Sequence, residues 1–179
     1  MEFYTACKNV PYTISIQFDA NSLLEAQRAL SYYGMQNRIS NHISIKYIDT
    51  ENALTEDRIR KTLDRLNGIR KISMESITIT KFNIMHFNEK CQESTLYLEV
   101  EPYSYLQRLH LIVIRELREL TNIYERHDLK NFIPHISCGI LPDGFSINEL
   151  NNELRKMPPV VIPNWSLVLH TSTREYSLL

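Results

Sequence analysis

Two short segments of this chain carry side chains suited to acid–base chemistry. They are His42-Ile43-Ser44-Ile45 and the near-copy His135-Ile136-Ser137-Cys138. In an extended strand successive side chains point to opposite faces, so the histidine and the serine of each segment share one face. Two such strands laid side by side would direct two imidazoles and two hydroxyls into one cleft. That set of groups is suited to acid–base work on a phosphodiester.

The two histidines could divide the proton transfers between them. A free imidazole has a pKa of about 6.5, so both protonation states are accessible near neutral pH. For hydrolysis, one neutral histidine takes a proton from the attacking water, and the other, protonated, donates to the departing ribose oxygen. Ser44 and Ser137 can hydrogen-bond the non-bridging phosphate oxygens. We therefore predict His42 and His135 as catalytic residues and the two serines as phosphate ligands.

The pattern His, apolar, Ser or Thr, apolar, written twice, resembles the two-histidine phosphoesterases. These include the 2′,5′-RNA-ligase-like proteins and the 2′,3′-cyclic nucleotide phosphodiesterases. The resemblance implies two βα lobes facing a groove, with His135 as the base and His42 as the acid. The sequence departs from the commonest family pattern in having serine in both motifs, and Asn41 where a proline often precedes the histidine; Pro134 keeps that feature.

Hydrophobic periodicity predicts strands and helices in the same order in both halves of the chain. We expect strands near 12–19, 42–48, 95–100, 135–141, 165–170 and 174–178, and one long or two short strands over 73–87. Helices are expected near 22–33, 55–67, 102–120 and 146–157. Ser22 with Glu25, and Ser146 with Glu149, have the form of capping boxes at two of the helix starts.

Each half thus reads strand, helix, motif strand, helix, strand. We predict an α+β fold of two pseudo-symmetric βα lobes, with antiparallel sheets facing a central cleft and helices on the outside. The prediction is a single bilobal domain over residues 1–179, with interleaved lobes near 1–88 and 95–179. Its motif strands are expected to line the floor of the cleft.

Composition restricts the class of partner. The formal net charge is −1, with no basic surplus of the kind that grips long nucleic acid. A nucleotide or short oligonucleotide is the expected substrate, without an extended nucleic-acid surface. No apolar stretch is long enough to cross a membrane, and three widely spaced cysteines suit a reducing compartment. We expect a monomeric cytoplasmic protein with no cofactor.

A metal site is disfavoured, because the partner of each motif histidine is a hydroxyl and no carboxylate accompanies either motif. On ideal alternation Lys46 shares the face of the first motif and Gly139 that of the second. Lys46 could place positive charge beside a phosphate. Tyr12, Tyr47 and Trp165 could stack on a base, although core packing is the stronger alternative for each.

The other four histidines receive less weight. His110 and His127 lie on or after a helix and are given no role. His86 and His170 lie near strand ends and could border the groove.

The expected function is metal-independent hydrolysis of a ribose-linked phosphodiester. A 2′,3′-cyclic phosphate, a 2′,5′-linked oligonucleotide and a cyclic oligonucleotide all remain open as substrates. RNA 2′,5′-ligation at the same site is a second enzymatic reading, because it is the reverse reaction. A nucleotide-binding module without turnover is the alternative from another class.

Overall fold

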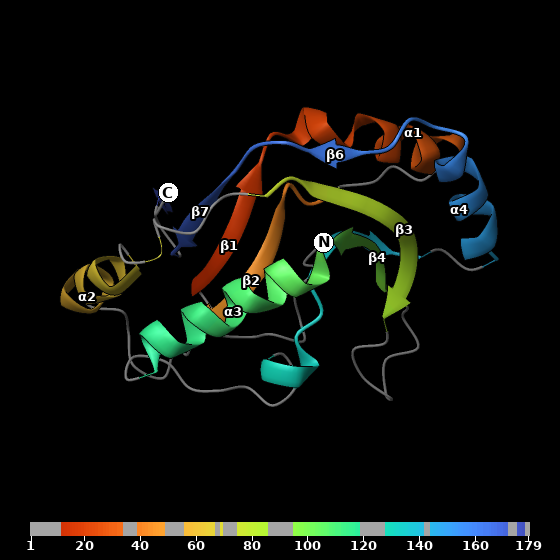
Figure 1. Cartoon of the computed structure of the whole chain (residues 1–179). Coiled ribbons are helices and arrows are strands. Elements are labelled where there is room, and N and C mark those ends of the chain that lie inside the picture. The colour runs from red at the N-terminus through yellow and green to blue at the C-terminus, as the bar shows by residue number, and fades with distance from the viewer. Residues whose placement is uncertain are drawn as a thin grey trace.

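Two antiparallel four-stranded sheets organise the protein (Figure 1). The computed structural model describes residues 12–33, 39–48, 56–66, 69, 75–85, 95–118, 128–141, 144–171 and 175–177. The first sheet has the order β2-β1-β7-β8, with β1 at Tyr12–Phe18, β2 at His42–Ile48, β7 at Trp165–His170 and β8 at Glu175–Ser177. The second has the order β5-β4-β3-β6, with β3 at Ile77–Met85, β4 at Thr95–Glu101, β5 at His135–Ile140 and β6 at Val161–Ile162. The α+β prediction is confirmed.

The described helices are α1 at Leu24–Tyr32, α2 at Glu56–Leu66, α3 at Tyr103–Leu117 and α4 at Ile147–Arg155, with short 3-10 turns at Ala20–Leu23 and Leu129–Asn131. Helix α3 packs against β2 and β4, while α4 packs against β3 and α1 (Figure 1). None of the described helices is long and apolar enough to cross a lipid bilayer.

The capping boxes are not formed as predicted. Asp19 precedes the first helical turn, and its carboxylate accepts a hydrogen bond from the Asn21 N–H at 2.9 Å. Ser146 is the N-cap of α4, but its side chain makes no capping hydrogen bond. An aspartate is as good an N-cap as a serine, so the sequence pattern alone could not rank the two starts of the first helix.

One strand of each half crosses to the sheet of the other half. Strand β3 follows β2 in the chain but pairs with β4, and β7 follows β6 but pairs with β1. Helix α3, which connects β4 to β5, packs against β2 of the other sheet. The two sheets therefore do not coincide with residues 1–88 and 95–179.

Each sheet has an apolar face in the core and a face that carries the motif residues. The first motif face comprises Thr13, Ser15, Gln17, His42, Ser44, Tyr47, Ser166, Val168 and His170, which lie opposite one another across β1, β2 and β7. The second motif face comprises Lys81, Asn83, Tyr97, Glu99, His135 and Ser137. The core side chains of the strands include Ile14, Ile16, Ile43, Phe82, Leu96, Leu98, Ile136, Leu167 and Leu169.

Both motif strands contain a β-bulge directly after the motif serine. In β2 the extra residue is Ile45, because its two neighbours face consecutive residues of β1. In β5 the extra residue is Cys138, because its two neighbours face consecutive residues of β4. A bulge shifts the alternation by one residue, so positions after it turn to the opposite face.

Candidate active site

His42 opens β2 and points to the first motif face. Its Nδ1 lies 2.7 Å from the hydroxyl oxygen of Ser40. Burial lowers the pKa of His42, and the positive charges of His170 and His135 lower it further, against a smaller opposing effect of Glu175. A lowered pKa favours the neutral imidazole, which is the form that accepts a proton.

His135 opens β5 and points to the second motif face. Its Nδ1 lies 2.8 Å from the carbonyl oxygen of Ile133. A carbonyl only accepts, so Nδ1 carries the proton, and Nε2 is the atom that gains or loses one. The ring also packs edge-on against Tyr97, with 5.4 Å between ring centroids, which fixes its orientation.

The two motifs meet where the two sheets adjoin. β2 and β5 are each at one edge of their sheet, and they pack against each other. The Ser40 N–H donates to the Ser137 carbonyl oxygen at 2.9 Å, which joins the residues beside the two histidines. His42 and His135 are near enough for the charge of one to act on the pKa of the other. The fold thus brings the two motif strands together, and the joint action of the two imidazoles remains a prediction.

The motif serines lie on the same faces as their histidines. Ser44 faces Ser15 on β1, and Ser137 faces Tyr97 on β4. Both motif serines are half-buried. Their role as phosphate ligands remains a prediction.

Lys46 does not lie where ideal alternation places it. The bulge at Ile45 turns Lys46 to the core face, opposite Ile14. There its Nζ lies 2.5 Å from Oδ2 of Asp128, with the two side chains 0% and 1% exposed. The prediction that Lys46 faces a substrate phosphate is therefore wrong.

Four other predicted residues have different outcomes. Tyr47 lies on the first motif face, so base stacking remains a prediction for it, whereas the Tyr12 side chain lies outside what the structure describes. Trp165 is in the core, where its indole N–H donates to the Glu75 carbonyl at 2.8 Å. Gly139 follows the bulge in β5 and lies opposite Leu96 of β4, yet it is exposed and an added Cβ would meet no atom within 4 Å, so the close approach of a ligand to its backbone remains a prediction.

His170 is a third imidazole at this site. Its ring centroid lies 6.1 Å from that of His42, and its Nδ1 lies 3.1 Å from a Glu175 oxygen. The sequence placed it at a strand end but could not show which sheet the strand joins. Among buried side-chain nitrogen and oxygen atoms of the described residues, Ser15 Oγ and His170 Nε2 have no hydrogen-bond partner. Both belong to the first motif face.

His110 was given no role from the sequence. In the structure it lies on the core side of the first sheet and makes hydrogen bonds near the site. The Leu129 N–H donates to its Nε2 at 3.0 Å, so Nδ1 carries the proton and donates to the Ile45 carbonyl at 2.6 Å. The ring stacks on Phe132 with 4.0 Å between centroids. His110 therefore ties the bulge of β2 to the segment that leads into β5.

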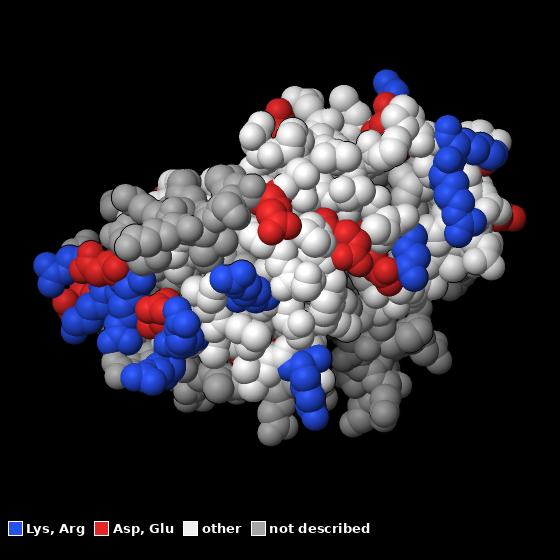
Figure 2. Space-filling model, in the orientation of Figure 1, with Lys and Arg blue, Asp and Glu red and all other residues white. Residues whose placement is uncertain are grey.

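Among the described residues, no three histidine, cysteine, aspartate or glutamate side chains are grouped as metal ligands. On the face shown in Figure 2, basic and acidic side chains are mixed over α2 rather than separated by sign. The metal-free site and the absence of an extended nucleic-acid surface remain predictions.

The chain matches no family model, and no curated protein matches it. Its structure is similar to that of Kluyveromyces marxianus Usb1 with uridine monophosphate, with a TM-score of 0.52 and 11% identity over 94% of this chain and 98% of that chain. It is also similar to TT0787 of Thermus thermophilus, with a TM-score of 0.55 and 14% identity over 93% of this chain and 97% of that chain. At these identities the similarity shows a shared fold.

Proposed function

We propose that the chain is a two-histidine phosphoesterase that hydrolyses a ribose-linked phosphodiester without a metal. The observation that supports the proposal is the contact between strands β2 and β5 of two different sheets, which begin with His42 and His135, each with one ring nitrogen held by a neighbouring group. Acid–base cleavage needs one group that accepts a proton and one that donates a proton, and two imidazoles in fixed orientations can fill these two roles. The fold shared with a Usb1 structure that contains uridine monophosphate agrees with a nucleotide substrate.

We infer one division of labour between the histidines from the lowered pKa of His42. Burial keeps His42 neutral to lower pH, so His42 takes the proton from the attacking water. His135 donates from Nε2 to the leaving ribose oxygen, while its Nδ1–H stays on the Ile133 carbonyl. This order is the reverse of the one that the family resemblance implies. Ser44 and Ser137 donate to the non-bridging oxygens.

The substrate is a nucleotide or short oligonucleotide with a 2′,3′-cyclic, 2′,5′-linked or cyclic diester. The proposal includes a monomeric protein. It also includes a cytoplasmic location, because the widely spaced cysteines suit a reducing compartment. Ligation at the same two histidines would use the same proton transfers in the opposite direction.

The test is turnover of a panel of 2′,3′-cyclic, 2′,5′-linked and 3′,5′-linked substrates in EDTA, with product phosphates identified. His42→Ala and His135→Ala should each lower kcat/KM roughly 10²- to 10⁴-fold, the usual value of a general acid or base. Ser44→Ala and Ser137→Ala are compared with Ser31→Ala, whose exposed hydroxyl bonds only within α1. Turnover that survives loss of both histidines would refute the proposal. Binding without turnover by the wild type would favour the nucleotide-binding module.

A further inference from the structure

A polar cluster continues the second motif face beyond His135. Glu99 on β4 lies directly opposite His135, and Lys81 on β3 lies directly opposite Glu99. Side chains paired in this way have Cβ atoms about 5 Å apart. Asn83 completes the group, which we call the Glu99 cluster: Lys81, Asn83 and Glu99.

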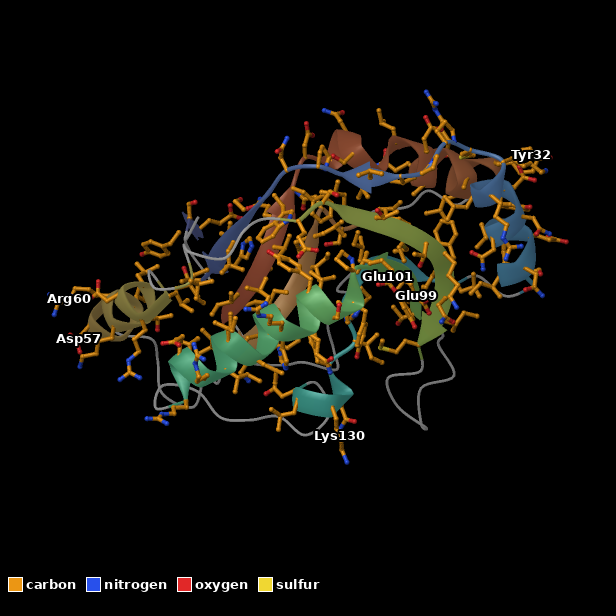
Figure 3. All side chains as sticks on the ribbon, in the orientation of Figure 1. Tyr32, Asp57, Arg60, Glu99, Glu101 and Lys130 are labelled. Carbon is orange, nitrogen blue, oxygen red and sulfur yellow. The ribbon has the colours of Figure 1, made fainter. Side chains whose placement is uncertain are left out.

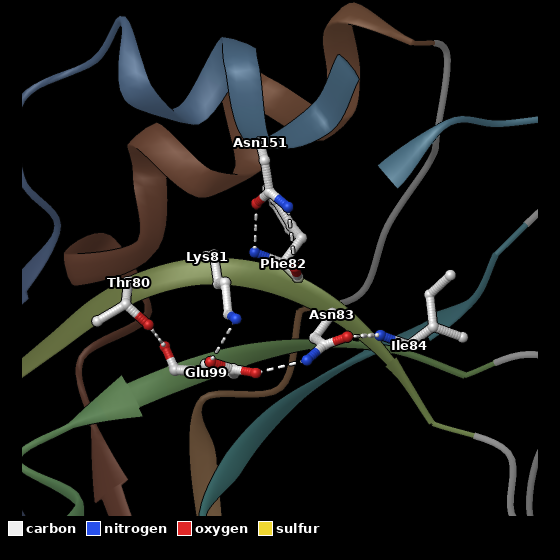
Figure 4. Close-up of polar contacts among 7 residues, drawn as sticks. All are labelled: Thr80, Lys81, Phe82, Asn83, Ile84, Glu99 and Asn151. Carbon is white, nitrogen blue, oxygen red and sulfur yellow. Dashed lines mark hydrogen bonds and ion pairs between the residues drawn. The ribbon is translucent and has the colours of Figure 1, made fainter. Parts of the chain in front are cut away.

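The carboxylate of Glu99 is held from two sides (Figure 4). Asn83 Nδ2 lies 2.5 Å from Glu99 Oε1, and Lys81 Nζ lies 3.3 Å from Oε2. Asn83 is fixed in turn, because its Oδ1 accepts the Ile84 N–H at 2.8 Å. The cluster therefore presents the Glu99 carboxylate in one orientation.

The strand beneath the cluster is anchored at the same point. Asn151 of α4 accepts the Phe82 N–H at 2.7 Å and donates to the Phe82 carbonyl at 3.0 Å (Figure 4). This pair of bonds fastens β3 to α4 between the two β3 members of the cluster. A recognition group on such a strand loses little freedom when a ligand binds.

The cluster remains accessible. The side chain of Lys81 is 51% exposed and that of Glu99 is 31% exposed. A carboxylate has about four lone-pair sites, of which the Asn83 and Lys81 contacts use two. An ion pair this exposed adds little to fold stability, so stability does not explain its place beside His135.

We propose that the Glu99 cluster reads the base of the nucleotide whose phosphate lies between His42 and His135, and that it prefers guanine. The proposal rests on the proposed function. The Watson–Crick edge of guanine carries two adjacent donors, N1–H and the 2-amino group, which match the two oxygens of one carboxylate. Lys81 can donate to the neighbouring O6. Unstacked bases of RNA are commonly read in this way on their Watson–Crick edge.

Other occupants fit the cluster less well. Adenine turns an acceptor, N1, toward the carboxylate, and uracil offers a single donor between two carbonyl oxygens. A second phosphate would meet the negative charge of Glu99 beside the positive charge of Lys81. Guanine is the base whose donors and acceptor match the carboxylate and the ammonium together.

The test measures binding rather than turnover, so it is separate from the test of the proposed function. Guanosine, inosine and adenosine 3′-monophosphates contain no diester and differ only at the base. Isothermal titration calorimetry in EDTA should show guanosine 3′-monophosphate bound about tenfold more tightly than inosine 3′-monophosphate, which lacks the 2-amino group, and more tightly still than the adenosine compound.

Glu99→Gln should bring the guanosine-to-inosine affinity ratio close to one, because the Gln amide turns a donor toward the base. The matched control is Glu101→Gln, which removes the same charge two residues along β4, where Figure 3 shows the two glutamates near each other. The control should keep the wild-type ratio. The proposal is overturned if the wild type binds the three nucleotides equally or not at all, or if Glu99→Gln keeps the preference. If the protein discriminates between the bases but turns over no diester, the proposed function is refuted and base recognition by the Glu99 cluster is retained.

Discussion

Lys46 and Asp128 form a buried ion pair behind the first motif face. Its two side chains are 0% and 1% exposed, with 2.5 Å between Nζ and Oδ2. Lys46 follows the bulge of β2, and Asp128 begins the segment that leads to β5. Replacing Asp128 with alanine leaves the lysine ammonium in the core without this carboxylate.

The expected loss follows from the burial. Breaking a buried ion pair by removing one partner costs about 3–5 kcal/mol, because the desolvated charge loses its compensation. In a chain of this size each kcal/mol shifts the melting temperature by about 2–4 °C, so Asp128→Ala should melt roughly 6–20 °C below the wild type.

The assay is thermal and urea denaturation of four proteins: wild type, Asp128→Ala, Lys46→Met, and Lys46→Met with Asp128→Leu. The double variant should recover most of the loss, because apolar side chains of similar volume can replace a buried ion pair. Asp57→Ala is the control, since its partner Lys61 and Asp57 itself are 57% and 51% exposed, and it should melt near the wild type. Wild-type stability of Asp128→Ala, or a double variant less stable than either single one, would refute the reasoning.

Two further predictions concern histidines whose pKa is lowered in the folded protein. His170→Ala removes a positive charge that lowers the pKa of His42, so the limb of the kcat/KM–pH profile that reports His42 should move to higher pH; an unmoved limb would contradict this. Burial lowers the pKa of His110, so the unfolded chain binds its proton more readily, and stability should fall as the pH drops below the ordinary value of about 6.5. Urea titrations of wild type and His110→Gln between pH 7.5 and 5 should show a smaller pH dependence in the variant, and equal slopes would count against it.

The sequence was sufficient wherever a two-residue period decides the structure. The strand predicted at 42–48 is β2, and within it Ile43 is in the core while His42 and Ser44 share the motif face. The same holds for the start of β5. Periodicity works here because one face of each strand is buried, so a shift by one residue would bury the polar side chains.

Alternation failed after the bulges, because a bulge has no compositional signature in these strands. Lys46 lies two residues beyond the motif serine of β2 and turns to the core side, whereas Gly139, at the same place in β5, is exposed and adopts a φ of 90°. For Lys46 the cost of burying the ammonium is offset by Asp128, which lies 82 positions further along the chain. A pairing at that separation is not visible in local pattern.

The sequence pattern also could not predict which strands pair with each other. Periodicity tells which face of a strand is buried but not which strand lies beside it. His170 stands near His42 because β7 crosses to pair with β1, and Glu99 stands beside His135 because β4 pairs with β5. The position of His170 beside His42 therefore depends on a strand that crosses between the halves, whereas Glu99 comes from the strand that precedes β5 in the same half.

The two halves of the chain resemble each other more closely in backbone structure than in side chains. In both halves a histidine opens an edge strand, a serine follows on the same face, and a bulge comes next, at Ile45 and at Cys138. In β2 the bulge turns the next residue, Lys46, to the core, and Tyr47 lies on the motif face again. The first half fills the position after the bulge with Lys46 and its buried ion pair, and the second has Gly139 at φ 90°, a conformation that favours glycine. Two different side-chain solutions at one backbone position indicate that the geometry of the histidine and serine pair, rather than the residue after it, is what the two halves share.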